Sequence, residues 1–215
     1  VVKGGRKVYS ELVIRDKKLH ARVSAHENRL HVHSFTKQPT PDGSTIWPFG
    51  RLQKLVPGEA PLVFLEMSHK GSVLGRVYLR LTADLAPEYR ECLVHLATGQ
   101  HGSGASLRGL KFRSSFDSIF ADCPSEQFRG VSVPPLSNAG GVSAGPGDVV
   151  AWFGSGYLSG LRFQVGPCGY HSGCCIVGRI QPGSSMDLIK AAHARSRRGG
   201  ELIRTITDCG LVLEQ

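Results

Sequence analysis

The sequence lacks the features that mark membrane-spanning and secreted proteins. It contains no apolar run of about 18 residues, the length that a membrane-spanning helix needs. Its first residues do not follow the basic, apolar and small-residue order of a secretory signal peptide. An initiator methionine is also missing, so we expect the chain to be a piece of a longer protein. These absences predict a protein without membrane association.

Cysteine is present, but not in the pattern of a disulfide-rich domain. The 6 cysteines have no regular framework spacing, and a chain of 215 residues can fold around its own apolar core. We therefore expect reduced thiols and an intracellular location, either cytoplasmic or nuclear. The glycine-rich stretch 136–147 lacks the Lys-Ser/Thr ending of a phosphate-binding loop, and we predict no cofactor.

What the sequence does contain is a globular composition with an excess of positive charge. Hydrophobic residues make up 40% and charged residues 20%, which predicts a folded core rather than disorder. The 26 Lys and Arg residues outnumber the 17 Asp and Glu residues, which gives a formal net charge of +9. This charge is compatible with nucleic-acid binding, although its scattered distribution favours simple solubility.

The first 60 residues predict a small β-meander followed by an irregular connector. Apolar and polar residues alternate in three short segments, 7–14, 19–24 and 30–35, as they do in half-buried strands. His31 and His33 fall on one strand face, as a metal-binding pair would, but 9 histidines in the chain make coincidence the better account. A sheet this small is marginal alone, so we expect it to pack on the main domain, 61–215.

The sequence of the main domain predicts a series of strands interrupted by two helices. Pro87 and Gly99 suit the first turn and the C-cap of one helix. Ser184 or Ser185 suits the N-cap of the other. The strongest predicted strands cover 62–68, 75–81, 202–207 and 210–213.

Two stretches of the main domain resemble the ends of the cyclophilin family of peptidyl-prolyl isomerases. Gly-Arg-Val-Tyr-Leu-Arg-Leu-Thr-Ala-Asp-Leu-Ala-Pro at 75–87 is similar to the family's opening strand and the start of its first helix. Gly-Arg-Ile-Gln-Pro-Gly-Ser-Ser-Met-Asp at 178–187 and Ile-Thr-Asp-Cys-Gly at 206–210 are similar to its closing segments. The resemblance implies a mainly β fold: a closed antiparallel β-barrel capped by two α-helices, with residues 1–60 as an N-terminal β extension.

The segment between these stretches departs from the family's active site. The resemblance implies a groove in which a cationic Arg holds the prolyl carbonyl, beside an apolar pocket for the proline ring. Aligned without gaps on Phe112, the first signature places Ser114 at the Arg position and Asp122 at a Gln position. Ile119 and Phe120 take the places of the pocket Phe and Met.

The second signature and the segment after it are changed as well. Phe153 stands in place of the family's Asn, while Phe163 keeps the pocket aromatic. Gly169 replaces the Trp that usually binds cyclosporin, and Cys174 replaces the His. With these groups replaced, we expect inefficient isomerase activity and no binding of cyclosporin.

Arg113 is the remaining candidate for the catalytic cation. A shift of the alignment by one residue gives it the Arg position. Such a shift reverses the face to which a strand side chain points. If Phe112 stays in the core, we expect Arg113 to point away from the groove.

A metal site is the other chemistry that the sequence offers. Cys168, His171, Cys174 and Cys175 supply zinc-type ligands at short spacing. No second Cys-x-x-Cys pair exists, and Cys also packs as a small hydrophobic residue. We therefore favour packing over metal binding and predict no metal.

The sequence as a whole favours a catalytically inactive cyclophilin-like domain that binds a protein or peptide, or acts as a scaffold within a larger protein. A weak isomerase is one alternative, and it requires Arg113 to enter the groove beside Phe120 and Phe163. A basic RNA-binding module is another. It requires four arginines to join the cations of the first 60 residues in one surface: Arg195, Arg197, Arg198 and Arg204.

Overall fold

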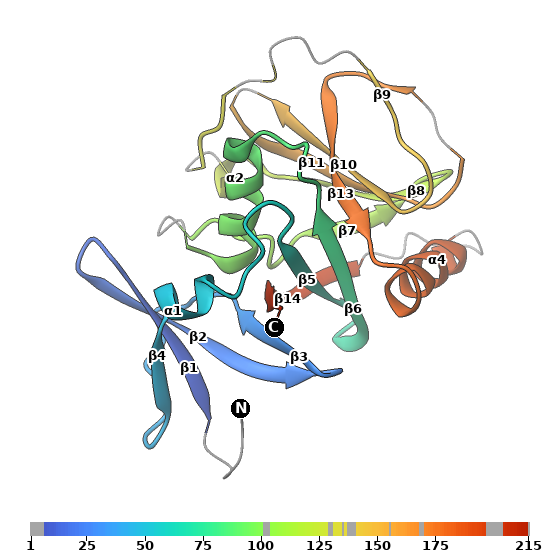
Figure 1. The fold of residues 1–215 in the computed structure, drawn as a ribbon. Helices are drawn as coiled ribbons and strands as arrows, with labels where there is room; N and C mark the ends of the chain where they lie inside the picture. The colour runs from blue at the N-terminus through green and yellow to red at the C-terminus, as the bar shows by residue number, and fades with distance from the viewer. Residues whose placement is uncertain are drawn as a thin grey trace.

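Most of the chain is placed in the structure, a computed structural model. It describes residues 7–100, 104–128, 131–134, 136, 141–154, 156–167, 170–196 and 204–214, with the backbone alone at 195 and 196. Figure 1 shows a barrel of strands with a smaller group of strands extending from one side. Within the described part, no helix is both long and apolar enough to cross a membrane.

The elements follow one another in this order. The strands are β1 (Val8–Ile14), β2 (Lys17–His26), β3 (Arg29–His33), β4 (Thr45–Pro48), β5 (Leu62–His69), β6 (Ser72–Leu81), β7 (Lys111–Ser114), β8 (Ser118–Asp122), β9 (Val142–Ser143), β10 (Asp148–Gly154), β11 (Tyr157–Gln164), β12 (Tyr170–His171), β13 (Cys174–Ile180) and β14 (Arg204–Leu213). The helices are α1 (Phe49–Gln53), α2 (Pro87–Thr98), α3 (Ser125–Phe128) and α4 (Ser184–Ser196).

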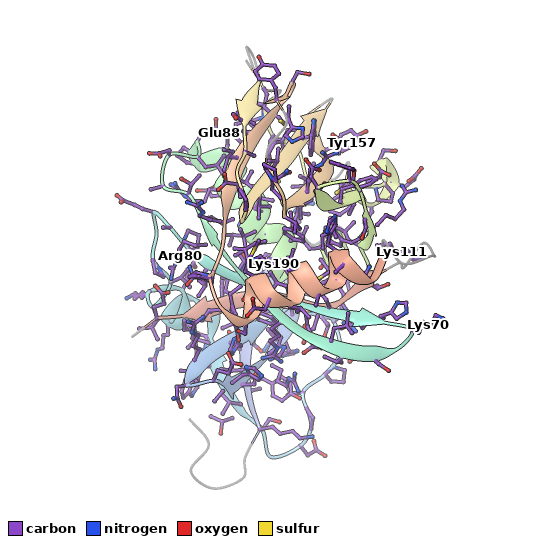
Figure 2. The ribbon with its side chains drawn as sticks, turned by 90° about the vertical axis from the view of Figure 1, so that its right-hand side faces the viewer. Lys70, Arg80, Glu88, Lys111, Tyr157 and Lys190 are labelled. Atoms are coloured by element: carbon purple, nitrogen blue, oxygen red, sulfur yellow. The ribbon has the colours of Figure 1, made fainter. Side chains whose placement is uncertain are left out.

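Eight of the strands close into a barrel. Their order is β14-β5-β6-β13-β10-β11-β8-β7, and β7 pairs again with β14. Helix α2 packs on β14 and β5, and α4 packs on β6, β7 and β8. Figure 1 shows these two helices on opposite sides of the barrel, and Figure 2 looks onto α4, which carries Lys190. The predicted β-barrel with two capping helices is confirmed.

The barrel interior is filled by apolar side chains from every second strand position. Leu65, Met67, Phe112 and Phe163 are buried completely, and the rings of Phe112 and Phe163 stack with their centroids 4.9 Å apart. Full burial of each such side chain stabilises the fold by about 1.5–3 kcal/mol. This interior fixes which strand residues point outward.

The two large helices begin and end close to the predicted positions. Pro87 occupies the first turn of α2, and Gly99 ends it in the left-handed conformation with φ of 68°. Ser184 and Ser185 both lie inside α4 rather than before it. The predicted capping role is wrong for Ser185, because its hydroxyl accepts a hydrogen bond from the Tyr78 backbone N–H at 3.0 Å.

Strands β1, β2 and β3 form the antiparallel meander that the alternation predicts. Two-residue turns join them, with positive φ at Arg15 and Asp16 and again at Glu27 and Asn28, as type I′ hairpins require. The segment expected to be irregular instead forms β4, parallel to β1, and α1. Its structure depends on tertiary packing, since Phe49 of α1 contacts the ring of Phe35.

The meander joins the barrel through β3, which pairs with the end of β14. The two strands approach closely at Gly210. A Cβ there would lie 2.0 Å from the Val32 carbonyl oxygen and 2.8 Å from the Phe64 ring. Only glycine allows this contact, so the attachment of the meander depends on one residue without a side chain.

We predict that Gly210→Ala lowers the free energy of unfolding by about 1–3 kcal/mol, because the added methyl must push β3 from β14. Gly58→Ala is the matched control, since a Cβ at Gly58 meets nothing within 4 Å. Urea denaturation of both variants measures the difference. Equal midpoints for the two would contradict the close contact.

We also predict that a chain starting at Pro61 aggregates or melts at a lower temperature than the full chain. Removing β1–β4 leaves the edge of β14 unpaired and uncovers apolar residues such as Leu211. Thermal denaturation and size-exclusion chromatography test this. A truncated chain that stays monomeric and melts like the full chain would show that the meander is an appendage.

Candidate functional site

The candidate site lies on the outer face of β7, β8, β11 and β10. Phe112 faces the barrel interior, so its neighbour Arg113 points outward, with its side chain 44% exposed. Arg113 pairs across the strands with Phe120, and Phe120 pairs with Arg162 of β11. Cross-strand partners share a face of the sheet, so these three side chains gather on the outside of the barrel.

The residues aligned with the family's groove divide between the two faces of these strands. Phe120 and Asp122 lie outside with Arg113, whereas Ile119, Phe153 and Phe163 are buried in the core. The aligned residues are divided in this way because neighbouring residues of a strand point to opposite faces. Ser114 pairs with Ile119 and shares its inward face. Gly169 lies outside the described residues.

Arg113 has the outward direction that the burial of Phe112 implies. Phe112 does stay in the core, but the outward direction that follows brings Arg113 beside Phe120 instead of removing it from the site. The guanidinium carbon lies 5.4 Å from the centre of the Phe120 ring. It does not reach Phe163, which is inside the barrel. Half of the arrangement required for a weak isomerase is therefore present.

A stack of alternating cations and rings crosses this outer face. Arg162 lies 5.7 Å from the Phe120 ring centre and 5.4 Å from that of Trp152, and the Trp152 ring meets His171 edge-on at 5.9 Å. With Arg113 at its other end, the stack links five strands, β7, β8, β11, β10 and β12. Each cation–ring contact at an exposed site contributes about 0.5–1 kcal/mol. The stack therefore holds the long Arg162 side chain in one place.

Arg113 is already engaged by a carboxylate. Its guanidinium donates to Asp122 Oδ2 at the end of β8. This ion pair separates two surface pockets, one of 380 Å³ beside Pro124 and Gln127, and one of 220 Å³ over Trp152 and Gly160. Asp122 lines both pockets and Arg113 lines the larger one, so the ion pair lies between them.

Several polar atoms beside the stack have no hydrogen-bond partner among the described residues. They are Ser118 Oγ, Gln164 Oε1, Arg162 Nε and His171 Nε2. Burial lowers the pKa of His171, and the charge of Arg162 lowers it further against the opposing effect of Asp117. Buried polar groups normally have partners. These atoms lie beneath the surface, where a peptide on the outer face does not reach them directly.

The predicted alternative metal set does not assemble in the described residues. Cys174 packs with Ala144 and Val150 on the outer side of β13, while Cys175 packs against the main core. Their sulfurs therefore face opposite sides of the strand, and no group of three or more His, Cys, Asp or Glu in the described part could hold a metal. Burial raises the pKa of Cys175 to about 12, which keeps it a thiol. Cys168 lies outside the described residues.

The basic surface required for RNA binding is not formed around Arg204. This side chain is 2% exposed and belongs to the buried part of β14. The side chain of Arg195 and residues 197 and 198 lie outside the described part. Arg204 is thus the one arginine of the predicted cluster whose side chain is described, and it does not lie on the surface.

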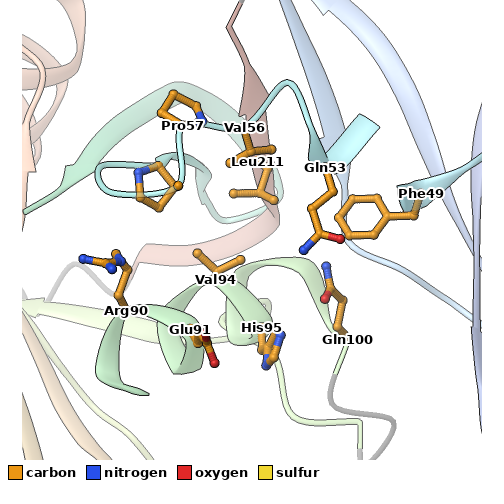
Figure 3. Close-up of a pocket in the computed structure, with 12 residues that line it drawn as sticks. Phe49, Gln53, Val56, Pro57, Arg90, Glu91, Val94, His95, Gln100 and Leu211 are labelled. Carbon is orange, nitrogen blue, oxygen red and sulfur yellow. The ribbon is translucent and has the colours of Figure 1, made fainter. Parts of the chain in front are cut away.

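A further pocket of 460 Å³ lies between α1 and α2. Figure 3 shows Val94 of α2 pointing toward Val56 and Leu211, and Gln100 pointing toward Gln53. Burial lowers the pKa of His95, and the charge of Glu91 opposes that shift. The sequence did not predict this pocket, because the helix that forms one wall was expected to be irregular.

The sequence also did not single out Trp152 and His171 as members of the outer-face stack. The signal was present in the alternation, since Arg162 precedes the buried Phe163 and must face outward. Trp152 lies across the sheet from Gly160, whose missing side chain leaves room for the indole ring.

Comparison with known proteins supports the fold. No family model matches the chain. The solved structure of the Mimivirus cyclophilin superimposes with a TM-score of 0.60 at 17% sequence identity, over 74% of this chain and 93% of that chain. At this identity the likeness concerns the fold. Together with the closed eight-stranded barrel, it shows that the chain has a cyclophilin-like fold with additional N-terminal strands.

Proposed function

We propose that this domain is a protein-interaction module that binds an extended peptide segment on its outer face and has little isomerase activity. It would serve as a binding or scaffolding part of a larger protein. The observation that carries this proposal is the ion pair between Arg113 and Asp122. It occupies the only cation that the resemblance offers for catalysis.

The ion pair matters because isomerase catalysis in the family is electrostatic. An Arg must direct its charge at the prolyl carbonyl and imide nitrogen, where the charge distribution changes during rotation. A carboxylate already holds the guanidinium of Arg113, and a neutral carbonyl competes poorly with a carboxylate for it. The family's Gln position also carries this negative charge. The arrangement supports binding more than catalysis.

The outer face has the chemistry of a peptide-binding surface. Trp152 and Arg162 belong to the residue types that dominate binding energy at protein interfaces, and Phe120 to those enriched there. Their stack is ordered before any partner binds, so little side-chain entropy is lost on association. The two neighbouring pockets can accept side chains of an extended segment. These features support a peptide or protein partner.

We further infer a reducing, intracellular environment. All 5 cysteines among the described residues are free. Burial raises the pKa of Cys92 and Cys123 to about 12, so both are unreactive thiols. Such cysteines act as small apolar side chains and have no need of an oxidising compartment.

We predict isomerase activity near background. A protease-coupled or exchange-NMR assay on an Ala-Pro peptide measures the rate, with an ordinary cyclophilin as the positive control. A rate within tenfold of that control, equivalent to about 1.4 kcal/mol of barrier, would contradict the proposal.

A weak isomerase is the second candidate, and the position of Arg113 beside Phe120 favours it. Asp122→Gln tests it by releasing Arg113 and restoring the family's residue type. We expect the variant to stay near background, because the Asn, Trp and His positions are also changed. Asp148→Asn, which breaks the ion pair with Arg179, is the matched control. An increase of tenfold or more in Asp122→Gln alone, abolished by adding Arg113→Ala, would establish the isomerase instead.

A further inference from the structure

A second group of reactive side chains lies where the N-terminal meander meets the barrel, away from the outer-face stack. It consists of Ser24 in β2, His33 in β3 and Asp208 in β14. Ser24 Oγ is 2.7 Å from His33 Nε2, and His33 Nδ1 is 2.6 Å from Asp208 Oδ2. A hydroxyl, an imidazole and a carboxylate linked in this order form a nucleophile, a base and a group that orients the base.

Strand pairing explains how these residues meet. Val23 pairs with Val32, and both are buried in the core, so Ser24 and His33 point to the opposite face. In β14, Gly210 pairs with His33, and a register shift between Ile206 and Asp208 interrupts the pairing with β5. Such bulges re-aim side chains. Here the bulged segment directs Asp208 at the imidazole.

The hydrogen bonds assign the role of each nitrogen. Nδ1 lies much closer to the carboxylate than to Arg22, at 2.6 Å against 3.4 Å, so it carries the proton and donates to Asp208. Nε2 is then the acceptor that faces the Ser24 hydroxyl. His33 is 4% exposed, and its ring packs edge-on against Phe64, so its orientation is fixed.

Asp208 is held as a carboxylate. Burial acts to raise its pKa, but the hydrogen bond and charge of His33, the Cys209 backbone N–H and the charge of Arg22 together lower it. The Cys209 N–H donates to Asp208 Oδ1 at 2.9 Å. One carboxylate oxygen is thus fixed by the backbone and the other by the imidazole, as the orienting acid of a triad requires.

A pocket of 480 Å³ is lined by His33 and Asp208, while Ser24 lies outside its lining on the other side of the imidazole. The loop from Thr36 to Pro41 forms one wall, and Arg108 and Thr207 of the barrel form another. Small-molecule sites often occur where two structural units meet. The polar and charged lining suits a small polar molecule better than an apolar chain.

We propose that Ser24 is an activated nucleophile that takes an acyl group from small esters, with His33 as its general base and Asp208 as the residue that orients the base. Ser24 Oγ attacks the ester carbonyl carbon while its proton passes to His33 Nε2. The carbon–oxygen bond to the leaving group breaks, and the alcohol leaves with that proton. A water molecule then gives a proton to His33 and attacks the acyl group, which releases the acid and restores Ser24.

Acylation of the full chain tests the proposal. We expect p-nitrophenyl acetate to release about one equivalent of nitrophenolate in a burst, and peptide mass spectrometry to find the acetyl group on Ser24. Ser44 serves as the internal reference, because its half-buried hydroxyl donates to the Pro41 carbonyl and not to an imidazole. Acetylation of Ser24 that is no faster than that of Ser44 overturns the proposal, and this comparison needs no variant.

Variants distinguish a Ser24 hydroxyl that is activated by His33 from one that reacts only because it is exposed. Ser24→Ala should abolish the burst. Asp208→Asn should slow acylation by about 100-fold or more, the usual size of a general-base effect. Asp148→Asn is the matched control, since Asp148 forms its ion pair with Arg179 and does not line this pocket. A folded Asp208→Asn variant, verified by its melting curve, that acylates at the original rate would overturn the role of the triad.

Discussion

Strand β14 hydrogen-bonds to three other strands, and every part of the molecule depends on those pairings. Arg204 and Thr205 pair with β7 and close the barrel. The middle of the strand pairs with β5, and Gly210–Leu213 pair with β3. One strand therefore completes the barrel and also carries the meander. Because Gly210 has no side chain, the backbones of β3 and β14 can approach at the point where the two units join.

Strand alternation then decides which residues can act on a ligand. Phe112 and Phe163 stack inside the barrel, and their packing fixes Arg113 and Arg162 on the outside. The outer face thus combines aromatic rings with cations, while the buried aromatics contribute only to stability. Our proposal of peptide binding with little catalysis rests on this surface, where Asp122 forms an ion pair with Arg113.

The meander does more than cover the barrel. Its pairing with β14 brings His33 against Asp208 and creates a polar pocket at the junction. The barrel and the meander each supply part of this arrangement, so neither would form it alone. The barrel closes without the meander. The meander nevertheless supplies Ser24 and His33, two of the three side chains of the proposed catalytic group.

The sequence by itself determined the meander strands, the helix α2 and the type of barrel, because those signals are local. Period-two alternation marked the meander strands, Pro87 and Gly99 marked the ends of α2, and the motifs at 75–87 and 178–187 pointed to the cyclophilin-like fold. Only the tertiary structure decided the faces and partners. An alignment without gaps could not show that Ile119 turns inward and Phe120 outward, because strand register depends on pairing with β7 and β11. His33 and Asp208 are 175 residues apart, and no local pattern reports a contact of that kind.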